Sequence, residues 1–168
     1  EASRHHKVTV STSGLVSVLG GKWTTYRKIA EDTVNTVQTV GGLTEKKCNT
    51  EEIHIFGYDQ NTDWQSPLHF YGTEAKKIKR LSKDGNKSLS EKIFITKNQI
   101  LWALREEMAI TLEDILARRT RCLFLDSFET EKIAEEVVII MADEMKKNNM
   151  WINQELKTFK SLVKNYRI

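Results

Sequence analysis

The segment from Gly20 to Arg27, with the sequence GGKWTTYR, combines residue types that bind anions. Two consecutive glycines let a backbone approach another molecule closely. If a helix begins after them, its first N–H groups lack intrahelical acceptors and carry partial positive charge, to which Lys22 adds a full charge. Because the segment is neither a P-loop nor GxGxxG, a plain strand-to-helix turn capped by Thr24 or Thr25, with Lys22 in solvent, explains the same residues. The spacing leaves both interpretations open.

Two strands and a helix are expected to hold this segment in place. Polar and apolar residues alternate over Lys7–Ser11, as in a half-buried strand, and Leu15–Leu19 has the pattern of a second strand. Apolar residues then recur at helical spacing over 24–40, and a glycine pair at 41–42 ends the helix. Strand, strand, glycine pair and helix together are typical of an α/β fold.

The chain beyond residue 42 is expected to be helical, after a polar linker over Thr44–Glu52 and a short strand-like run, Ile53–Phe56. Capping-box patterns begin at Thr96 and Thr111, and the first of them should place Met108 on the buried face of its helix. The predicted helices cover 72–83, 96–108, 111–126, 130–147 and 153–166. The fold class is therefore mainly α: a bundle-like helical domain over 46–168, preceded by a β-hairpin and helix over 1–45.

Composition excludes several classes of function. The net charge of +3 is too small to require a nucleic-acid partner. Cys48 and Cys122 lack CxxC or zinc-finger spacing, which indicates inert thiols in a reducing, cytoplasmic compartment. The four histidines show no pair with ligand spacing, so no metal site is predicted. No apolar run approaches the roughly 20 residues that span a bilayer.

Several motifs closely resemble the flavin-dependent glycerol-3-phosphate dehydrogenases. The resemblance extends from residue 3 to residue 126, and the Gly20–Arg27 run is its most specific part. The other matching stretches are Ser3–Val8, Ser13–Val16, Ala30–Thr33, Glu107–Ala109, Thr111–Asp114, Arg118–Arg121 and Leu123–Asp126.

The resemblance implies that the chain is the C-terminal third of such an enzyme, and that residues 1–45 are the remnant of an FAD-binding domain. It implies substrate binding by Arg4 and Lys22, because a guanidinium fork suits the phosphate of glycerol 3-phosphate. It also implies that Gly21, Lys22, Trp23 and Thr24 face the pyrimidine edge of FAD. No catalytic residue and no metal ligand is assigned within the chain.

The same resemblance implies the reaction: oxidation of glycerol 3-phosphate to dihydroxyacetone phosphate, with electrons passing from FAD to quinone. The upstream FAD domain is then a partner, a homodimer is allowed, and a fragment without that domain is expected to be inactive. A glycerol-3-phosphate oxidase, which delivers electrons to oxygen, carries the same motifs. A stand-alone helical interaction module is the alternative of another class, but it leaves Gly20–Arg27 unexplained.

Two surface features stay open at this point. Arg118, Arg119 and Arg121 either satisfy carbonyls and carboxylates at helix ends or bind phosphate or nucleic acid. The basic amphipathic helix 153–166 either packs on its own core or lies on an anionic membrane. The expected location is cytoplasmic, with peripheral attachment to the inner face of the cell membrane.

Overall fold

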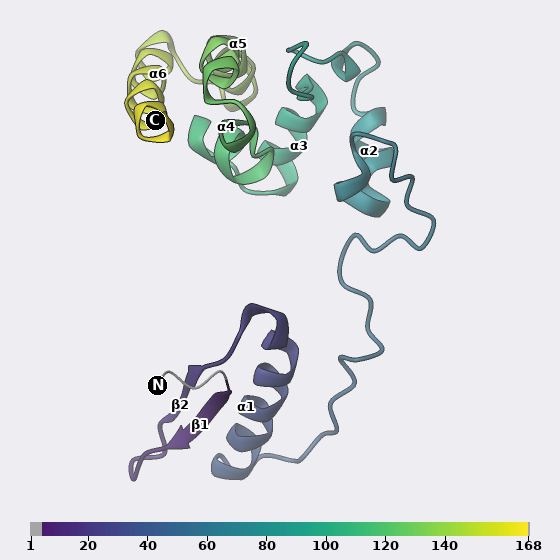
Figure 1. Ribbon diagram of the computed structural model, residues 1–168, viewed down its shortest axis with the longest axis vertical. Coiled ribbons are helices and arrows are strands. Elements are labelled where there is room, and N and C mark those ends of the chain that lie inside the picture. Colours follow the sequence, from purple (N-terminus) through teal and green to yellow (C-terminus); the bar gives the residue numbers. More distant parts are fainter. Residues whose placement is uncertain (1–4, 168) are drawn as a thin grey trace. The chain divides into compact units, whose positions relative to one another are not determined.

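A computed structural model describes residues 5–167 of the chain and divides it into two compact units, one ending at Phe56 and the other beginning at Gly57 (Figure 1). This division lies downstream of the predicted boundary at residues 45 and 46. Both units have the secondary structure that the sequence predicts in outline, and the mainly α fold class is confirmed.

The first unit consists of a β-hairpin and one long helix. Strands β1 (His6–Val10) and β2 (Val16–Gly20) pair antiparallel, with His6 opposite Gly20 at one end and Val10 opposite Val16 at the other. A 3-10 turn, Trp23–Thr25, then leads into α1 (Tyr26–Val40). The predicted hairpin and helix are confirmed to within two residues at each end.

The segment after α1 folds back along that helix. The backbone N–H of Lys46 donates to the side-chain oxygen of Gln38 at 2.9 Å, and Arg27 donates to Thr50 at 3.2 Å and to Glu51 at 2.8 Å. We call residues 43–51 the return segment. The strand predicted at Ile53–Phe56 is wrong, because this stretch has no strand partner and its apolar side chains are exposed.

No described residue of the hairpin or of α1 is fully buried. Large apolar side chains on both elements stay in contact with solvent, including Leu15 at 66%, Leu19 at 64% and Val34 at 56% exposure. A two-stranded hairpin needs further packing to be stable by itself. The first unit therefore presents more apolar surface than it covers.

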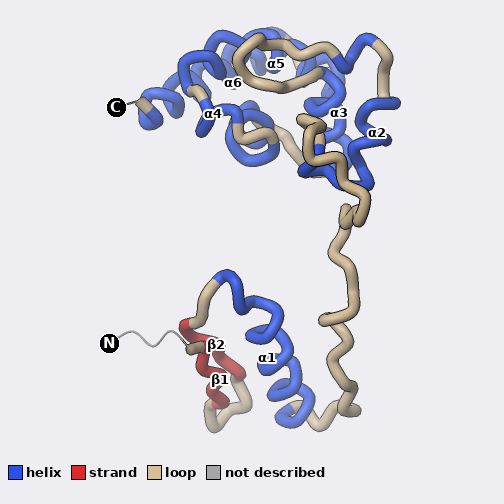
Figure 2. The backbone as a smooth tube through the Cα atoms, turned by 45° about the vertical axis from the view of Figure 1, so that its right-hand side comes forward, coloured by secondary structure: helices blue, strands red, loops and turns tan. Residues whose placement is uncertain are grey.

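The regular elements of the second unit are helices joined by loops (Figure 2). Its buried side chains form one large hydrophobic cluster and a smaller one around Ile78 and Trp102. Its elements in order are a 3-10 helix His69–Glu74, α2 Ala75–Arg80, a 3-10 turn Asp84–Asn86, α3 Lys97–Glu106, a π-helix Asp114–Arg119, α4 Cys122–Leu125, α5 Ser127–Met145, α6 Asn149–Val163 and a 3-10 turn Lys164–Tyr166. Ile100, Leu116, Val137 and Phe159, which come from four of these elements, are at most 2% exposed. Burial of such side chains stabilises a fold by about 1.5–3 kcal/mol each.

Side-chain caps fix where the main helices of this unit begin. Thr96 and Gln99 form the predicted capping box, each accepting a hydrogen bond from the other's backbone N–H at 3.2 and 3.0 Å. Thr111 and Asp114 make the same reciprocal pair at 3.1 and 3.0 Å. Each cap stabilises its helix by about 1 kcal/mol, which is why both predicted starts are confirmed.

The predicted helix over 111–126 is interrupted. The chain forms a π-helix and then turns at Arg121, whose φ of +60° is left-handed, before α4 begins. Met108 was expected on the buried face of its helix, but it follows the end of α3, has a φ of +58° and is 86% exposed. Within residues 5–167, no helix combines the length and the apolar character needed to cross a membrane.

Candidate functional site

The glycine pair forms a tight turn between β2 and the following helix. Gly20 and Gly21 have φ values of +76° and +88°, which side-chain-bearing residues rarely adopt. A Cβ on Gly21 would lie 2.6 Å from the Cδ1 of Ile29 and 3.3 Å from the Cβ of His6. The space that a side chain on Gly21 would need is therefore taken by the chain's own side chains, which gives this glycine a structural reason of its own.

Thr25 caps the turn, as the structural interpretation of this segment required. Its hydroxyl donates to the carbonyl oxygen of Lys22 at 2.9 Å and accepts from the N–H of Lys22 at 3.3 Å. The N–H of Thr25 also donates to the Lys22 carbonyl at 3.0 Å. At such a start the first N–H groups of the helix, those of Trp23 and Thr24, have no acceptor within it.

The predicted cofactor-binding residues occupy the exposed outer side of this turn. Lys22, Trp23 and Thr24 are exposed, and the Trp23 side chain is 88% accessible. The rings of Trp23 and Tyr26 are tilted against each other with centroids 6.0 Å apart. Among residues 5–167 the structure records no ion pair for Lys22, so its charge is available to a ligand. The cap and the anion-binding interpretation are thus compatible.

Arg4, the other predicted substrate-binding residue, lies outside the described residues. The structure does show where the chain continues from it. His6 is the first residue of β1, and the Nε2 of its imidazole lies 2.9 Å from the Oδ2 of Asp32 on α1. The other oxygen of this carboxylate lies 2.9 Å from the Nζ of Lys28. The hydrogen-bonded Lys28 ammonium holds the pKa of Asp32 below its usual value; the His6 contact adds to this and desolvation opposes it.

Arg27, the last residue of the GGKWTTYR motif, connects α1 to the return segment. Its guanidinium pairs with Glu31 at 3.0 Å and with Glu51 at 2.8 Å, and it lies 3.9 Å from the Sγ of Cys48. Hydrogen bonds from Thr50 lower the pKa of the Cys48 thiol, with a smaller contribution from Arg27. Sequence reasoning missed this role of Arg27, as it missed the His6–Asp32 pair, because both contacts join residues more than twenty positions apart.

In the second unit, two of the three arginines of the 118–121 motif satisfy groups of their own unit. Arg118 pairs with Glu113 at 2.6 Å and with Asp114 at 2.8 Å. Arg119 donates twice to the carbonyl oxygen of Glu107, at 3.0 and 2.7 Å. These contacts match the structural alternative for Arg118 and Arg119. In the described part of the chain, no group of three or more His, Cys, Asp or Glu side chains could hold a metal ion.

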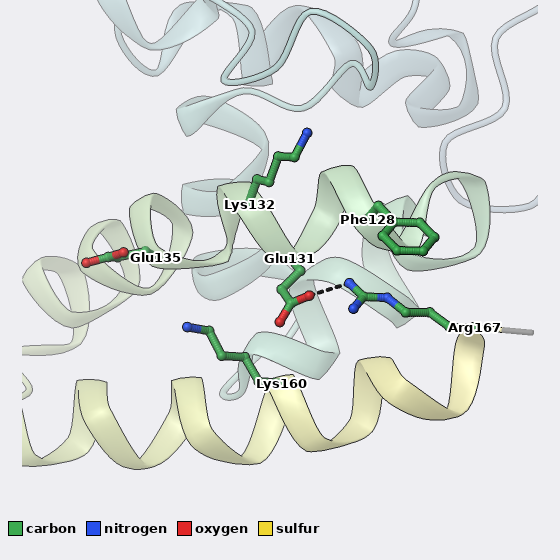
Figure 3. A pocket seen from close by; sticks show the side chains of 6 residues that line it. All are labelled: Phe128, Glu131, Lys132, Glu135, Lys160 and Arg167. Atoms are coloured by element: carbon green, nitrogen blue, oxygen red, sulfur yellow. Dashed lines mark hydrogen bonds and ion pairs between the residues drawn. The ribbon is translucent and has the colours of Figure 1, made fainter.

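A cavity of about 370 Å³ between α5 and α6 is lined by acidic and basic side chains and by Phe128 (Figure 3). Glu131 forms an ion pair with Arg167, whose guanidinium also lies 4.3 Å above the ring of Phe128. Phe159 and Val163 of α6 are buried in the main hydrophobic cluster of the unit. The final helix therefore packs its apolar face on its own core.

Comparison with known proteins is consistent with the motifs described above. A family model described as the C-terminal domain of alpha-glycerophosphate oxidase matches residues 16–151. The curated relatives include the Dictyostelium discoideum protein named "Probable glycerol-3-phosphate dehydrogenase, mitochondrial", with 33% identity over 98% of this chain. They also include mitochondrial glycerol-3-phosphate dehydrogenases of Mesocricetus auratus and Caenorhabditis elegans, each 31% identical, over 93% and 85% of this chain.

The chain spans only 29%, 24% and 23% of the length of these three relatives. Their names also overturn one expectation. The predicted cytoplasmic location is wrong, because these relatives are mitochondrial by name. The predicted attachment to the inner face of the cell membrane is wrong for the same reason. The prediction used unpaired cysteines as its signal, and these report a reducing environment without specifying the compartment. The match over most of its length shows that this chain belongs to the family of the C-terminal domain of alpha-glycerophosphate oxidase.

Proposed function

We propose that this chain is the C-terminal part of an FAD-dependent enzyme that oxidises glycerol 3-phosphate to dihydroxyacetone phosphate. The observation that carries the proposal is the exposed, cationic turn at Gly20–Tyr26, in a chain whose curated relatives are named glycerol-3-phosphate dehydrogenases. Those names also support a mitochondrial location for the whole enzyme. The chain's share of its relatives' length supports a larger protein in which the remaining residues supply most of the FAD site.

The role proposed for Lys22 and Arg4 is to bind the phosphate dianion of the substrate. Lys22 stands at the start of a helix, exposed and without an ion pair among the described residues, so its ammonium adds to the positive end of the helix dipole. Arg4 precedes the hairpin strand that pairs with β2, and its guanidinium can form two parallel hydrogen bonds to phosphate.

The turn also fits one edge of a flavin ring. The backbone N–H groups of Trp23 and Thr24, at the start of the helix, have no acceptor within that helix. They can therefore donate to carbonyl or ring-nitrogen acceptors of a ligand. FAD, when bound, supplies the acceptor for the hydride from substrate C2. The proposed part of this chain is to donate hydrogen bonds to the pyrimidine edge, where the helix dipole and Lys22 stabilise negative charge. Gly21 contributes the turn itself.

The uncovered apolar surface of the first unit supports packing against the rest of the enzyme. Its hairpin and helix bury none of their described residues, while Leu15 and Leu19 are each more than 60% exposed. We propose that the upstream FAD domain covers this surface. The 168-residue chain alone is then expected to be colourless and inactive. Stoichiometric flavin absorption that survives gel filtration of the chain would contradict this.

The electron acceptor separates two versions of the proposal. The names of the relatives favour a dehydrogenase, for which we propose quinone as the acceptor, while the description of the matching family names an oxidase, for which the acceptor would be oxygen. The test is to measure oxygen consumption and peroxide release by the purified full-length enzyme with glycerol 3-phosphate, with and without a soluble quinone. Turnover that needs quinone and releases no peroxide identifies the dehydrogenase. A full-length enzyme without turnover under either condition would reject the proposed function.

A further inference from the structure

The two residues that the proposed function assigns to the substrate are close in sequence to the same end of the hairpin. The last pair of the β1–β2 ladder is His6 opposite Gly20. Arg4 stands two residues before His6 in the sequence, and Lys22 stands two residues after Gly20. A ligand held by Lys22 therefore binds beside this end of the hairpin, so whatever fixes this end also fixes the position of the Lys22 turn.

His6 makes three structural contacts at this position. Its backbone pairs with Gly20, and its Cβ lies 3.3 Å from the point that a side chain on Gly21 would occupy. Its Nε2 lies 2.9 Å from the Oδ2 of Asp32, in the second turn of α1. Both side chains are partly shielded, with 20% and 34% exposure. His6 thus links the start of β1, the glycine turn and α1.

The chemistry of the pair determines which atom holds the proton. The Asp32 carboxylate also pairs with Lys28 at 2.9 Å, so it is held as an anion between two donors. An ionised carboxylate only accepts hydrogen bonds, so the Nε2 of His6 must carry the hydrogen. Hydrogen bonds to a charged partner are shorter and stronger than neutral ones. The link between β1 and α1 is therefore directional as well as close.

We infer that His6, held by Asp32, is a positioning residue for the substrate phosphate: it fixes the glycine turn that leads to Lys22 against β1 and α1. This inference rests on the proposed function. Two cations stabilise one phosphate together only when both lie within hydrogen-bond distance of it, and small displacements of a positioned group reduce rates strongly. If the His6–Asp32 hydrogen bond only stabilised the fold, its loss would instead reduce folding stability and flavin retention, and it would not specifically weaken the binding of phosphate.

The test compares His6→Leu, Asp32→Asn and His6→Gln in the full-length flavoenzyme. His6→Leu and the nearly isosteric Asp32→Asn are expected to raise KM for glycerol 3-phosphate about tenfold or more, with a smaller change in kcat. The Kd of inorganic phosphate, measured by calorimetry on the holoenzyme, should rise in parallel. His6→Gln keeps an N–H donor that reaches Asp32 and should restore most of the KM. Lys7→Ala, on the exposed side of the same strand, is the matched control and should behave as wild type.

A double-variant cycle with Lys22→Ala then tests whether His6 acts through Lys22. If it does, His6→Leu should cost little more in an enzyme that already lacks the Lys22 ammonium, so the two losses in kcat/KM should not multiply. Multiplying losses, a wild-type KM in His6→Leu, a His6→Gln enzyme as weak as His6→Leu, or loss of flavin as the main defect would each overturn the inference. A wild-type enzyme that does not oxidise glycerol 3-phosphate would instead reject the proposed function, and that result is obtained before any variant is made.

Discussion

At the position of Gly21, the space for a side chain is already taken by Ile29 and His6. Replacement by alanine must shift one of these neighbours and also adopt a φ of +88°. We predict that Gly21→Ala lowers the melting temperature of the full-length enzyme, with a destabilisation of about 1–3 kcal/mol from overpacking in addition to backbone strain.

Gly42→Ala is the matched control, because Gly42 has a φ of +59° but no neighbouring atom within 4 Å of the point that a Cβ would occupy. It should show backbone strain alone, about 1–2 kcal/mol. Equal melting temperatures for the two variants would mean that the contacts of the new methyl group at position 21 with Ile29 and His6 do not measurably lower the stability.

Lys22 is expected to contribute to substrate affinity and not to flavin retention. Its side chain is exposed and makes no ion pair within residues 5–167, so removing it leaves the turn intact. Lys22→Ala in the full-length enzyme should reduce kcat/KM for glycerol 3-phosphate at least about tenfold, since a hydrogen bond to a charged group contributes roughly 1.5–3 kcal/mol. Arg4→Ala should cause a loss of similar size. Lys46→Ala, a charge-matched substitution in the return segment, should leave the kinetics unchanged. Wild-type kinetics for Lys22→Ala would contradict its assignment.

Tyr71 offers a test of pH dependence in the second unit. Burial raises the pKa of its hydroxyl to about 12, from 10.0, against a smaller, opposite effect of the neighbouring Gln99 side chain, and within the described residues no hydrogen bond of normal geometry reaches this hydroxyl. Between about pH 10 and 12 the unfolded chain releases this proton while the folded chain keeps it, so stability falls as the pH rises.

Tyr71→Phe should therefore be at least as stable as wild type at pH 7, because it removes an unsatisfied buried polar group. Its advantage should grow as the pH is raised above about 10. Urea titrations of both proteins at pH 7 and pH 10.5 measure this difference. A smaller advantage at the higher pH would show that Tyr71 is not held neutral by burial.

At the scale of elements, Arg27 of α1 contacts the later half of the return segment, whereas Gln38 contacts its earlier half. Arg27 contacts Cys48, Thr50 and Glu51, and trypsin can cleave after Lys46 and Lys47 in the same segment. We predict that Arg27→Ala increases the rate of tryptic cleavage there several-fold, since local opening controls proteolysis of the folded state. Arg118→Ala, which breaks comparable ion pairs in the second unit, is the control. An unchanged cleavage pattern in Arg27→Ala would show that other contacts hold the segment.

The elements also show which features local sequence can predict. The hairpin, α1 and the starts of α3 and of the helical turn at Thr111 follow from alternation, glycine pairs and capping boxes, all of which act over a few residues. The interruption at Arg121 does not follow, because a left-handed arginine has no sequence pattern of its own and depends on surrounding packing. For the same reason the exposed turn at Lys22 could be predicted, while the His6–Asp32 pair could not.

At the scale of the whole molecule, the two units differ in how much core they possess. Residues 57–168 contain the buried cluster that includes Ile100, Leu116 and Phe159, and we predict that they fold alone. A purified 57–168 fragment should show a cooperative, helical melt by circular dichroism, whereas residues 1–56 should show none. A cooperative melt of the 1–56 fragment would mean that the hairpin and α1 need no further partner.

The stretch of sequence that matches the family is shorter than the stretch whose elements pack together in the structure. The family match begins at residue 16, the first residue of β2, and ends at residue 151, early in α6. A piece cut at those positions would lose the strand that carries His6 and the helix turns that bury Phe159 and Val163. The stretch of sequence that identifies this family is therefore shorter than the stretch that must be expressed to study it.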